Sequence, residues 1–181
     1  DAPCQTVPLK SYQEIFRNKA FLGFSAISIF IWALYTQLSL SVPLRAEDIL
    51  PDPSVVSLIW TINSIIVILL QTPISRWLIE KIHPMYSLAL GILFVGGGLT
   101  SIYWSTNFYS LAFSGVIFII GEMLIVPTMD SAVSRIGTTR MIGAFFGIAN
   151  FISGLGEGIG KYAGGQLLSF GTMTSIPWFT Y

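Results

Sequence analysis

The stretch SLAFSGVIFIIGEMLIVP, residues 110–127, is long enough to cross a bilayer as a helix and carries a single charge, Glu122. A carboxylate inside a membrane-spanning helix costs roughly 2.5–3.5 kcal/mol on insertion scales. Such residues therefore usually face the interior of a helix bundle or a water-filled cavity. Glu122 is the first candidate for a functional residue in this chain.

The composition of the whole chain is typical of a membrane protein. Of its 181 residues, 53% are hydrophobic and 10% are charged, whereas soluble domains carry about 25% charged residues. The formal net charge of zero gives no indication of nucleic-acid binding. The single cysteine and single histidine, Cys4 and His83, supply neither a disulfide framework nor a metal site. We therefore expect an all-α integral membrane protein that binds no metal, cofactor or nucleic acid.

Five apolar runs predict a polytopic bundle with five complete transmembrane helices. The expected spans are residues 20–43, 54–75, 85–104, 108–130 and 141–168. Residues 1–19 are polar and are interpreted as a cytoplasmic linker with an amphipathic lead-in, and Pro43 is expected to close the first span. The final PWFTY resembles the start of a sixth span from residue 177, so we expect the bundle to occupy 20–181 and to stop inside that span.

The basic residues predict an orientation. With the N-terminus in the cytoplasm, seven lysines and arginines fall in cytoplasmic segments and two, Arg45 and Lys161, fall outside. Cytoplasmic loops of membrane proteins carry such an excess of positive charge. We expect a multi-pass protein of the cell (inner or plasma) membrane, surrounded by lipid, with the N-terminus of this segment in the cytoplasm.

The first two spans each carry a polar face at helical spacing. Lipid offers nothing to these side chains, so the faces are expected to point inward, either as contacts between helices or as the lining of a solute cavity. The expected cavity residues are Trp32, Tyr35, Gln37, Trp60, Asn63, Ser64 and Gln71.

Glycines and charges mark the later spans. The fifth span carries a stripe at spacings of 4, 7 and 4 that would let a neighbouring helix approach closely: Gly143, Gly147, Gly154 and Gly158. Glu157 and Lys161 are expected near its outer end, either as a local i, i+4 ion pair or in transport. Four charged residues are expected to anchor or gate the cytoplasmic ends: Arg76, Lys81, Asp130 and Arg135.

The sequence contains no enzyme motif. GLGEGIGKYAGG, residues 154–165, has a GxGxxG-like spacing but lies inside a predicted span with no preceding strand, so no dinucleotide site is expected. Inward polar faces and one buried acid are instead typical of a transporter. Burial favours the neutral form of a carboxylic acid, so Glu122 could exchange protons near neutral pH. Alternatively, it merely pairs with a polar group on a neighbouring helix.

Four stretches share the order and spacing of a known family. They are ALYTQLSLSVPL (33–44), QTPISRWLIEKI (71–82), GEMLIVPTMDSAVSRIG (121–137) and GEGIGKYAGGQLL (156–168). Together they resemble the C-terminal half of a major facilitator superfamily transporter, in the drug:proton antiporter branch, and most closely MdtH-like multidrug exporters. The resemblance covers nearly the whole chain.

The resemblance implies both a fold and a function. The five spans would be helices seven to eleven of a twelve-helix transporter, and the missing N-terminal six-helix half would be the partner. Substrate would bind near the midplane between the halves. An acid at the position of Glu122 is implicated in proton or cation handling in the family. The expected function is efflux of small amphipathic or cationic compounds by alternating access, with the proton gradient as energy source.

Two other interpretations remain open. A solute:proton symporter of the same superfamily would take up sugars, peptides or organic acids. A cationic residue in the cavity would favour anionic substrates, and the sequence places none in mid-span. A non-transporting membrane scaffold or sensor could keep the same fold. In the full-length coding sequence, an upstream six-span half would support transport, and a signalling domain would support the sensor.

Overall fold

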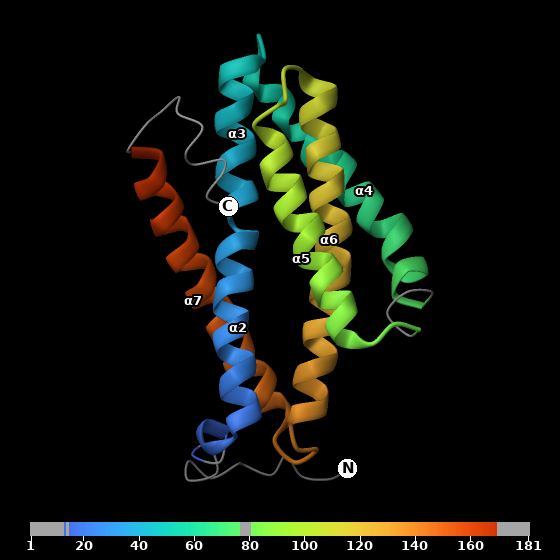
Figure 1. Ribbon diagram of the computed structural model, residues 1–181, viewed down its shortest axis with the longest axis vertical. Helices are drawn as coiled ribbons and strands as arrows, with labels where there is room; N and C mark the ends of the chain where they lie inside the picture. Colours follow the sequence, from blue (N-terminus) through green and yellow to red (C-terminus); the bar gives the residue numbers. More distant parts are fainter. Residues whose placement is uncertain (1–12, 14, 77–80, 170–181) are drawn as a thin grey trace, which may run out of the picture.

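The computed structural model describes residues 13, 15–76 and 81–169, which form a bundle of long helices (Figure 1). Within these described residues, five helical segments are long and apolar enough to cross a membrane: Lys19–Ile49, Pro53–Ile74, Pro84–Ile102, Phe108–Ile136 and Ile142–Leu167. The expected all-α, polytopic bundle with five membrane-length helices is confirmed. Most of the predicted linker and lead-in at 1–19, namely residues 1–12 and 14, and the sixth span from 177 lie outside the described residues.

The first segment contains two helices, α2 (Lys19–Tyr35) and α3 (Gln37–Ile49), with Thr36 between them. The expectation that Pro43 closes this span is wrong, because α3 continues past it for six residues. A proline inside a membrane helix is tolerated where the surrounding groups satisfy the freed backbone. The interruption falls instead at Thr36, whose carbonyl accepts a hydrogen bond from the Ser39 hydroxyl at 2.7 Å.

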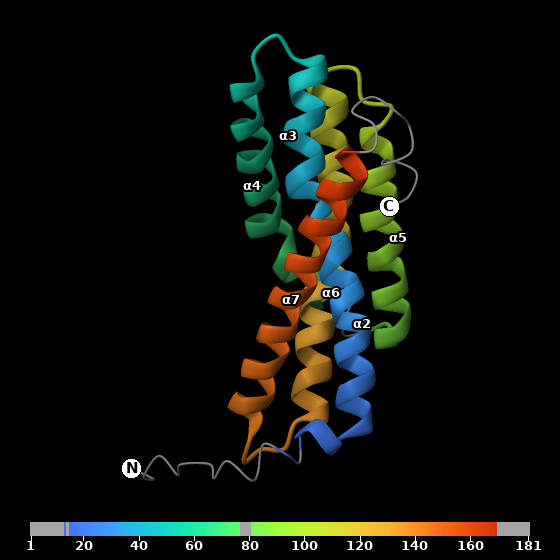
Figure 2. The same ribbon diagram turned by 90° about the vertical axis from the view of Figure 1, so that its left-hand side faces the viewer.

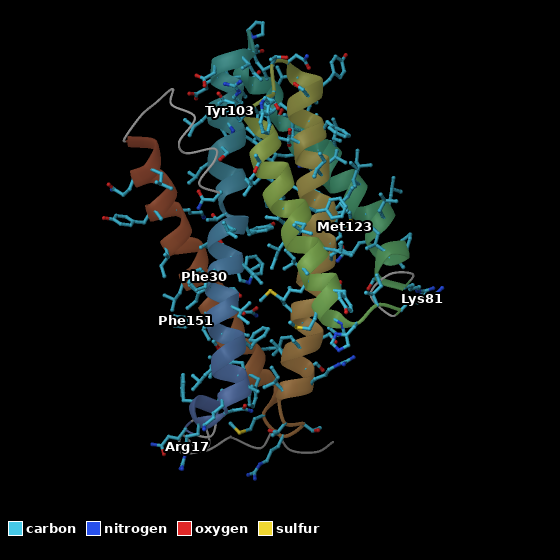
Figure 3. The ribbon with its side chains drawn as sticks, viewed as in Figure 1. Arg17, Phe30, Lys81, Tyr103, Met123 and Phe151 are labelled. Carbon is cyan, nitrogen blue, oxygen red and sulfur yellow. The ribbon has the colours of Figure 1, made fainter. Side chains whose placement is uncertain are left out.

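The remaining helices are the short 3-10 helix η1 (Pro53–Val55), α4 (Val56–Ile74), α5 (Pro84–Ile102), α6 (Phe108–Ile136) and α7 (Ile142–Ser169). Figure 1 shows α7 and α4 at opposite edges, with the other helices between them. In the view of Figure 2, α4 and α5 lie on opposite sides of the bundle. Figure 3 places Arg17 near its lower end and Tyr103 near its upper end.

Polar side chains begin most of these helices. The Asn18 side chain accepts hydrogen bonds from the first turn of α2, and Asn107 forms a capping box with Ser110 at the start of α6. His83 caps α5 through its Nδ1 atom, so this histidine is part of a helix start. Asp52 caps η1, and its hydrogen bonds from Ser54 lower the pKa of the Asp52 carboxyl.

One contact surface, here called the α5–α6 seam, brings α5 and α6 together through glycines. A Cβ atom added to Gly98 would lie 2.7 Å from the backbone nitrogen of Phe118. One added to Gly121 would lie 2.6 Å from the carbonyl oxygen of Gly91. Any larger residue at these positions would force the two backbones apart, so the seam depends on glycine.

A second contact surface, the α7 seam, joins α7 to α2 and α3. It is built on Gly156, Gly160 and Gly164, where an added Cβ would meet Ile29, Ala33 and Gln37 respectively. The predicted stripe is therefore wrong: among the residues that the structure describes, nothing lies within 4 Å of a Cβ at Gly143, Gly147, Gly154 or Gly158. Positions two residues apart, such as 158 and 160, lie about 200° apart around a helix, so the two glycine rows occupy opposite faces of α7.

Candidate functional site

A cavity of about 400 Å³, here called the Glu122 cavity, lies where α4 and α6 meet the junction of α2 and α3. Its lining residues are Tyr35, Leu38, Trp60, Asn63, Ser64, Val67, Ile68, Ile119 and Glu122. The structure thus brings Glu122 together with four of the seven residues expected to line a solute cavity. The volume falls in the range of roughly 300–1,000 Å³ that is usual for small-molecule sites.

Glu122 lies at the middle of α6 and reaches the last residue of α2. The Tyr35 hydroxyl donates a hydrogen bond to its Oε1 atom at 3.1 Å. Among the described residues, neither ion pair within 4.0 Å involves Glu122. A carboxylate offers about four lone-pair sites, so one bond from Tyr35 leaves capacity for a proton or a cationic ligand.

Aromatic rings hold Tyr35 in place beside Glu122. Its ring centroid lies 5.0 Å from that of Trp32 in an edge-on contact and 5.6 Å from that of Phe118. Tyr35 is also the residue directly before the interruption at Thr36. The hydrogen bond to Glu122 therefore ties the acid on α6 to the point where the first span changes from α2 to α3.

Asn63 contributes an unpaired amide to this region. The residue is 3% exposed, and neither its Nδ2 nor its Oδ1 atom has a hydrogen-bond partner in the described part of the chain. It packs against Gly115 of α6, whose missing side chain leaves room for the amide. Buried polar groups are nearly always paired with protein or water. This amide therefore remains able to bind water or a polar ligand group.

Gln37 does not line the Glu122 cavity, contrary to expectation. Its amide nitrogen donates to the carbonyl oxygens of Ala33 and Gly160, each at 2.8 Å, and so joins the first span to α7. Gln37 follows Tyr35 by two residues, which places the two side chains on different faces of the span. Helical spacing suggested that Gln37 shares a face with Tyr35 only because residues beside the polar face were counted as part of that face.

Trp32 and Gln71 also lie outside the Glu122 cavity. Trp32 lines a separate space of about 30 Å³ together with Asp130. Gln71 is exposed on the last turns of α4.

Four charged residues were expected at the cytoplasmic ends. Besides Asp130, these are Arg76, Lys81 and Arg135, which are exposed.

A second cavity of about 170 Å³, here called the Lys161 cavity, adjoins the first. Tyr35, Leu38 and Trp60 line both cavities, and Thr36, Ser39, Glu157 and Lys161 complete the second. The Lys161 Nζ atom lies 3.9 Å from Glu157 Oε2. The sequence predicts this ion pair but does not indicate a cavity beside it.

The sequence predicts that this ion pair lies near the outer end of the span, and Lys161 lies eight residues before the end of α7. Gly160, beside Lys161, packs against Ala33 and Thr36, which places the pair at the level of the interruption in the first span. That level is close to the Tyr35–Glu122 hydrogen bond at the middle of α6. The register between α7 and α2 sets this depth. One signal in the sequence could have indicated this depth, because both charges lie inside an apolar run.

No family model matches the chain, but a comparison with known proteins finds relatives. The chain is 24% identical over 168 residues to the multidrug resistance protein MdtH of Edwardsiella ictaluri (strain 93-146), covering 91% of this chain and 42% of that protein. It is 22% identical over 164 residues to the protein of the same name from Cronobacter sakazakii (strain ATCC BAA-894), covering 91% and 41%. The resemblance to MdtH-like proteins is confirmed. The chain spans less than half the length of these curated relatives.

Proposed function

We propose that this chain forms one half of a proton-coupled transporter that exports small amphipathic or cationic compounds. The observation that carries the proposal is the Glu122 cavity at the middle of α6, in which a carboxylate without a cationic partner among the described residues faces aromatic side chains. The similarity to proteins named for multidrug resistance and the five membrane-length helices support the same function. The partner in the proposal is an N-terminal six-helix half.

The cavity offers complementary contacts to an amphipathic cation. Tyr35 and Trp60 present aromatic rings, which bind both apolar groups and cations over their faces. Glu122 supplies the opposite charge. Val67, Ile68 and Ile119 provide apolar walls for the rest of the ligand. A compound that combines an apolar body with a positive group satisfies all of these surfaces.

Competition at Glu122 would couple export to protons. A carboxylate in apolar surroundings is unfavourable unless a proton or a cation neutralises it. If the substrate and the proton exclude each other there, each must leave before the other binds. Rocking of this bundle against the other half would then expose the site alternately to the two sides of the membrane. In this proposal, the proton gradient is the energy source. The proposal also places the N-terminus of the segment in the cytoplasm.

Replacing Glu122→Gln in the complete transporter tests this proposal. We expect the variant to insert normally and to lose proton-driven uptake of ethidium into inside-out membrane vesicles, because glutamine neither binds nor releases a proton. Glu47→Gln is the matched control, since Glu47 is exposed at the end of α3. Ethidium binding should also release protons from the purified wild-type protein and not from Glu122→Gln. Normal pH-dependent export by Glu122→Gln would contradict the proposal.

A further inference from the structure

The Lys161 cavity holds two full charges that the proposed function does not use. Both lie on α7 at the depth of the interruption at Thr36, where charged side chains are costly and usually functional. An i, i+4 ion pair on a helix returns only a small part of that cost. Local stabilisation of α7 therefore does not account for the pair.

The geometry leaves Lys161 available to an anion. Its Nζ atom lies 3.9 Å from Glu157, which is longer than the roughly 2.7–2.9 Å of a charge-assisted hydrogen bond. The Lys161 side chain is 56% exposed. The Ser39 hydroxyl in the same cavity already donates to the Thr36 carbonyl. Lys161, with three donors and a positive charge, is thus the group in this cavity best suited to hold an anionic oxygen.

The shared wall connects this cation to the first cavity. Tyr35 and Trp60 line both the Glu122 cavity and the Lys161 cavity. An aromatic ring resting on this wall could direct one substituent toward Glu122 and another toward Lys161. The two cavities therefore offer opposite charges on either side of one aromatic platform.

We propose that the Lys161 cavity is a subsite for a carboxylate carried on an aromatic ligand, with the ring against Tyr35 and Trp60. This inference rests on the proposed function, because it assigns a second substituent to the ligand of the same site. Glu157 competes with that carboxylate for Lys161. Removing Lys161 and removing Glu157 should therefore have opposite effects on ligands that carry the carboxylate.

Two dyes provide a matched pair of probes. Rhodamine 110 carries a free carboxylate, and rhodamine 123 is its methyl ester, so the two share one aromatic core and differ at the acid. In equilibrium binding to the purified complete transporter, Lys161→Gln should raise the ratio of the Kd for rhodamine 110 to that for rhodamine 123 about tenfold, the size expected for a charged hydrogen bond. Glu157→Gln should lower the same ratio. Lys161→Arg should retain most of the wild-type ratio, since it keeps the charge.

The outcomes separate this inference from the proposed function. Failure of the wild-type protein to bind rhodamine 110, an unchanged ratio in Lys161→Gln, or a shift in the same direction in Glu157→Gln would each overturn the carboxylate subsite. Binding needs no proton gradient. If the ratios shift as expected but vesicles show no proton-driven uptake of rhodamine 123, the proton-coupled export is contradicted and the subsite stands.

Discussion

The α5–α6 seam and the α7 seam are both built on glycines, but they differ in the groups beside them. In the α5–α6 seam, α5 carries no charged residue, although Glu122 follows Gly121 on α6, and the hydroxyls of Ser87 and Thr128 are hydrogen-bonded across the seam at 3.0 Å. The α7 seam includes a span interrupted at Thr36, and the Oε1 atom of Gln37 in this seam is buried without a hydrogen-bond partner among the described residues. Charged residues of the Lys161 cavity stand next to it.

This difference indicates two roles for close glycine packing. In the α5–α6 seam, continuous helices and paired polar groups make one arrangement of the two helices strongly preferred. In the α7 seam, the interruption at Thr36 and the unpaired Oε1 atom of Gln37 leave local alternatives, as expected of an element that moves. We expect damage to the first seam to reduce stability, and damage to the second to reduce transport as well.

The largest effect should come from Gly98→Ala in the α5–α6 seam. The new Cβ would lie 2.7–2.9 Å from backbone atoms and the Cβ of Phe118, which cannot rotate away. Overpacking of this kind destabilises by about 1–3 kcal/mol, and the upper part of that range is expected here. The control is Gly97→Ala, where nothing lies within 4 Å. It should leave stability unchanged or raise it by up to about 1 kcal/mol. Reversible unfolding in mixed detergent measures the stability of both variants. Equal stabilities of Gly98→Ala and Gly97→Ala would contradict the dependence of the seam on glycine.

Gly160→Ala should have a smaller effect on stability and a separate effect on transport. Its Cβ would meet the Ala33 backbone as well as Thr36, but α7 lies at the edge of the bundle (Figure 1) and is less buried than α6, so it can move away more easily and about 1–2 kcal/mol is expected. The transport rate per folded molecule should also fall, because the contact at the interruption changes. Gly158→Ala, on the open face of α7, is the matched control. If Gly160→Ala lowers only the amount of folded protein, the two seams do not differ in role.

The bundle could be predicted from the sequence because the bilayer imposes a simple length and polarity rule. Long apolar runs must form helices there, so the five segments were recognisable without knowledge of their packing. Glu122 was recognisable for the same reason, since a charge inside such a run is rare. Its bond to Tyr35 could not be derived, because 87 residues separate the two and no local pattern links them.

The errors at the glycine stripe and at Gln37 share one physical cause, which is the choice between faces of a helix. Gly158 and Gly160 belong to equally regular rows, and only the position of α2 decides which row packs. Gln37 was assigned to the cavity, but its face meets α7. Lys161 was placed by its distance from the end of the span, whereas the register with α2 sets its depth. Helix periodicity defines faces but does not say which neighbour each face meets.

The smallest effect, that of Ser87→Ala, tests whether polar contacts or glycines hold the α5–α6 seam. The change removes the bond to Thr128, yet the Thr128 hydroxyl still donates to the Leu124 carbonyl at 2.6 Å, so no buried donor is stranded. Hydrogen bonds between membrane helices average about 0.6 kcal/mol, and a loss of that size is expected, with transport per folded molecule unaltered. Ser101→Ala, which removes a bond within α5, is the control. A loss of stability as large as that of Gly98→Ala would mean that hydroxyls rather than backbone proximity stabilise the seam. The difference between this seam and the α7 seam would then depend on hydrogen bonding alone.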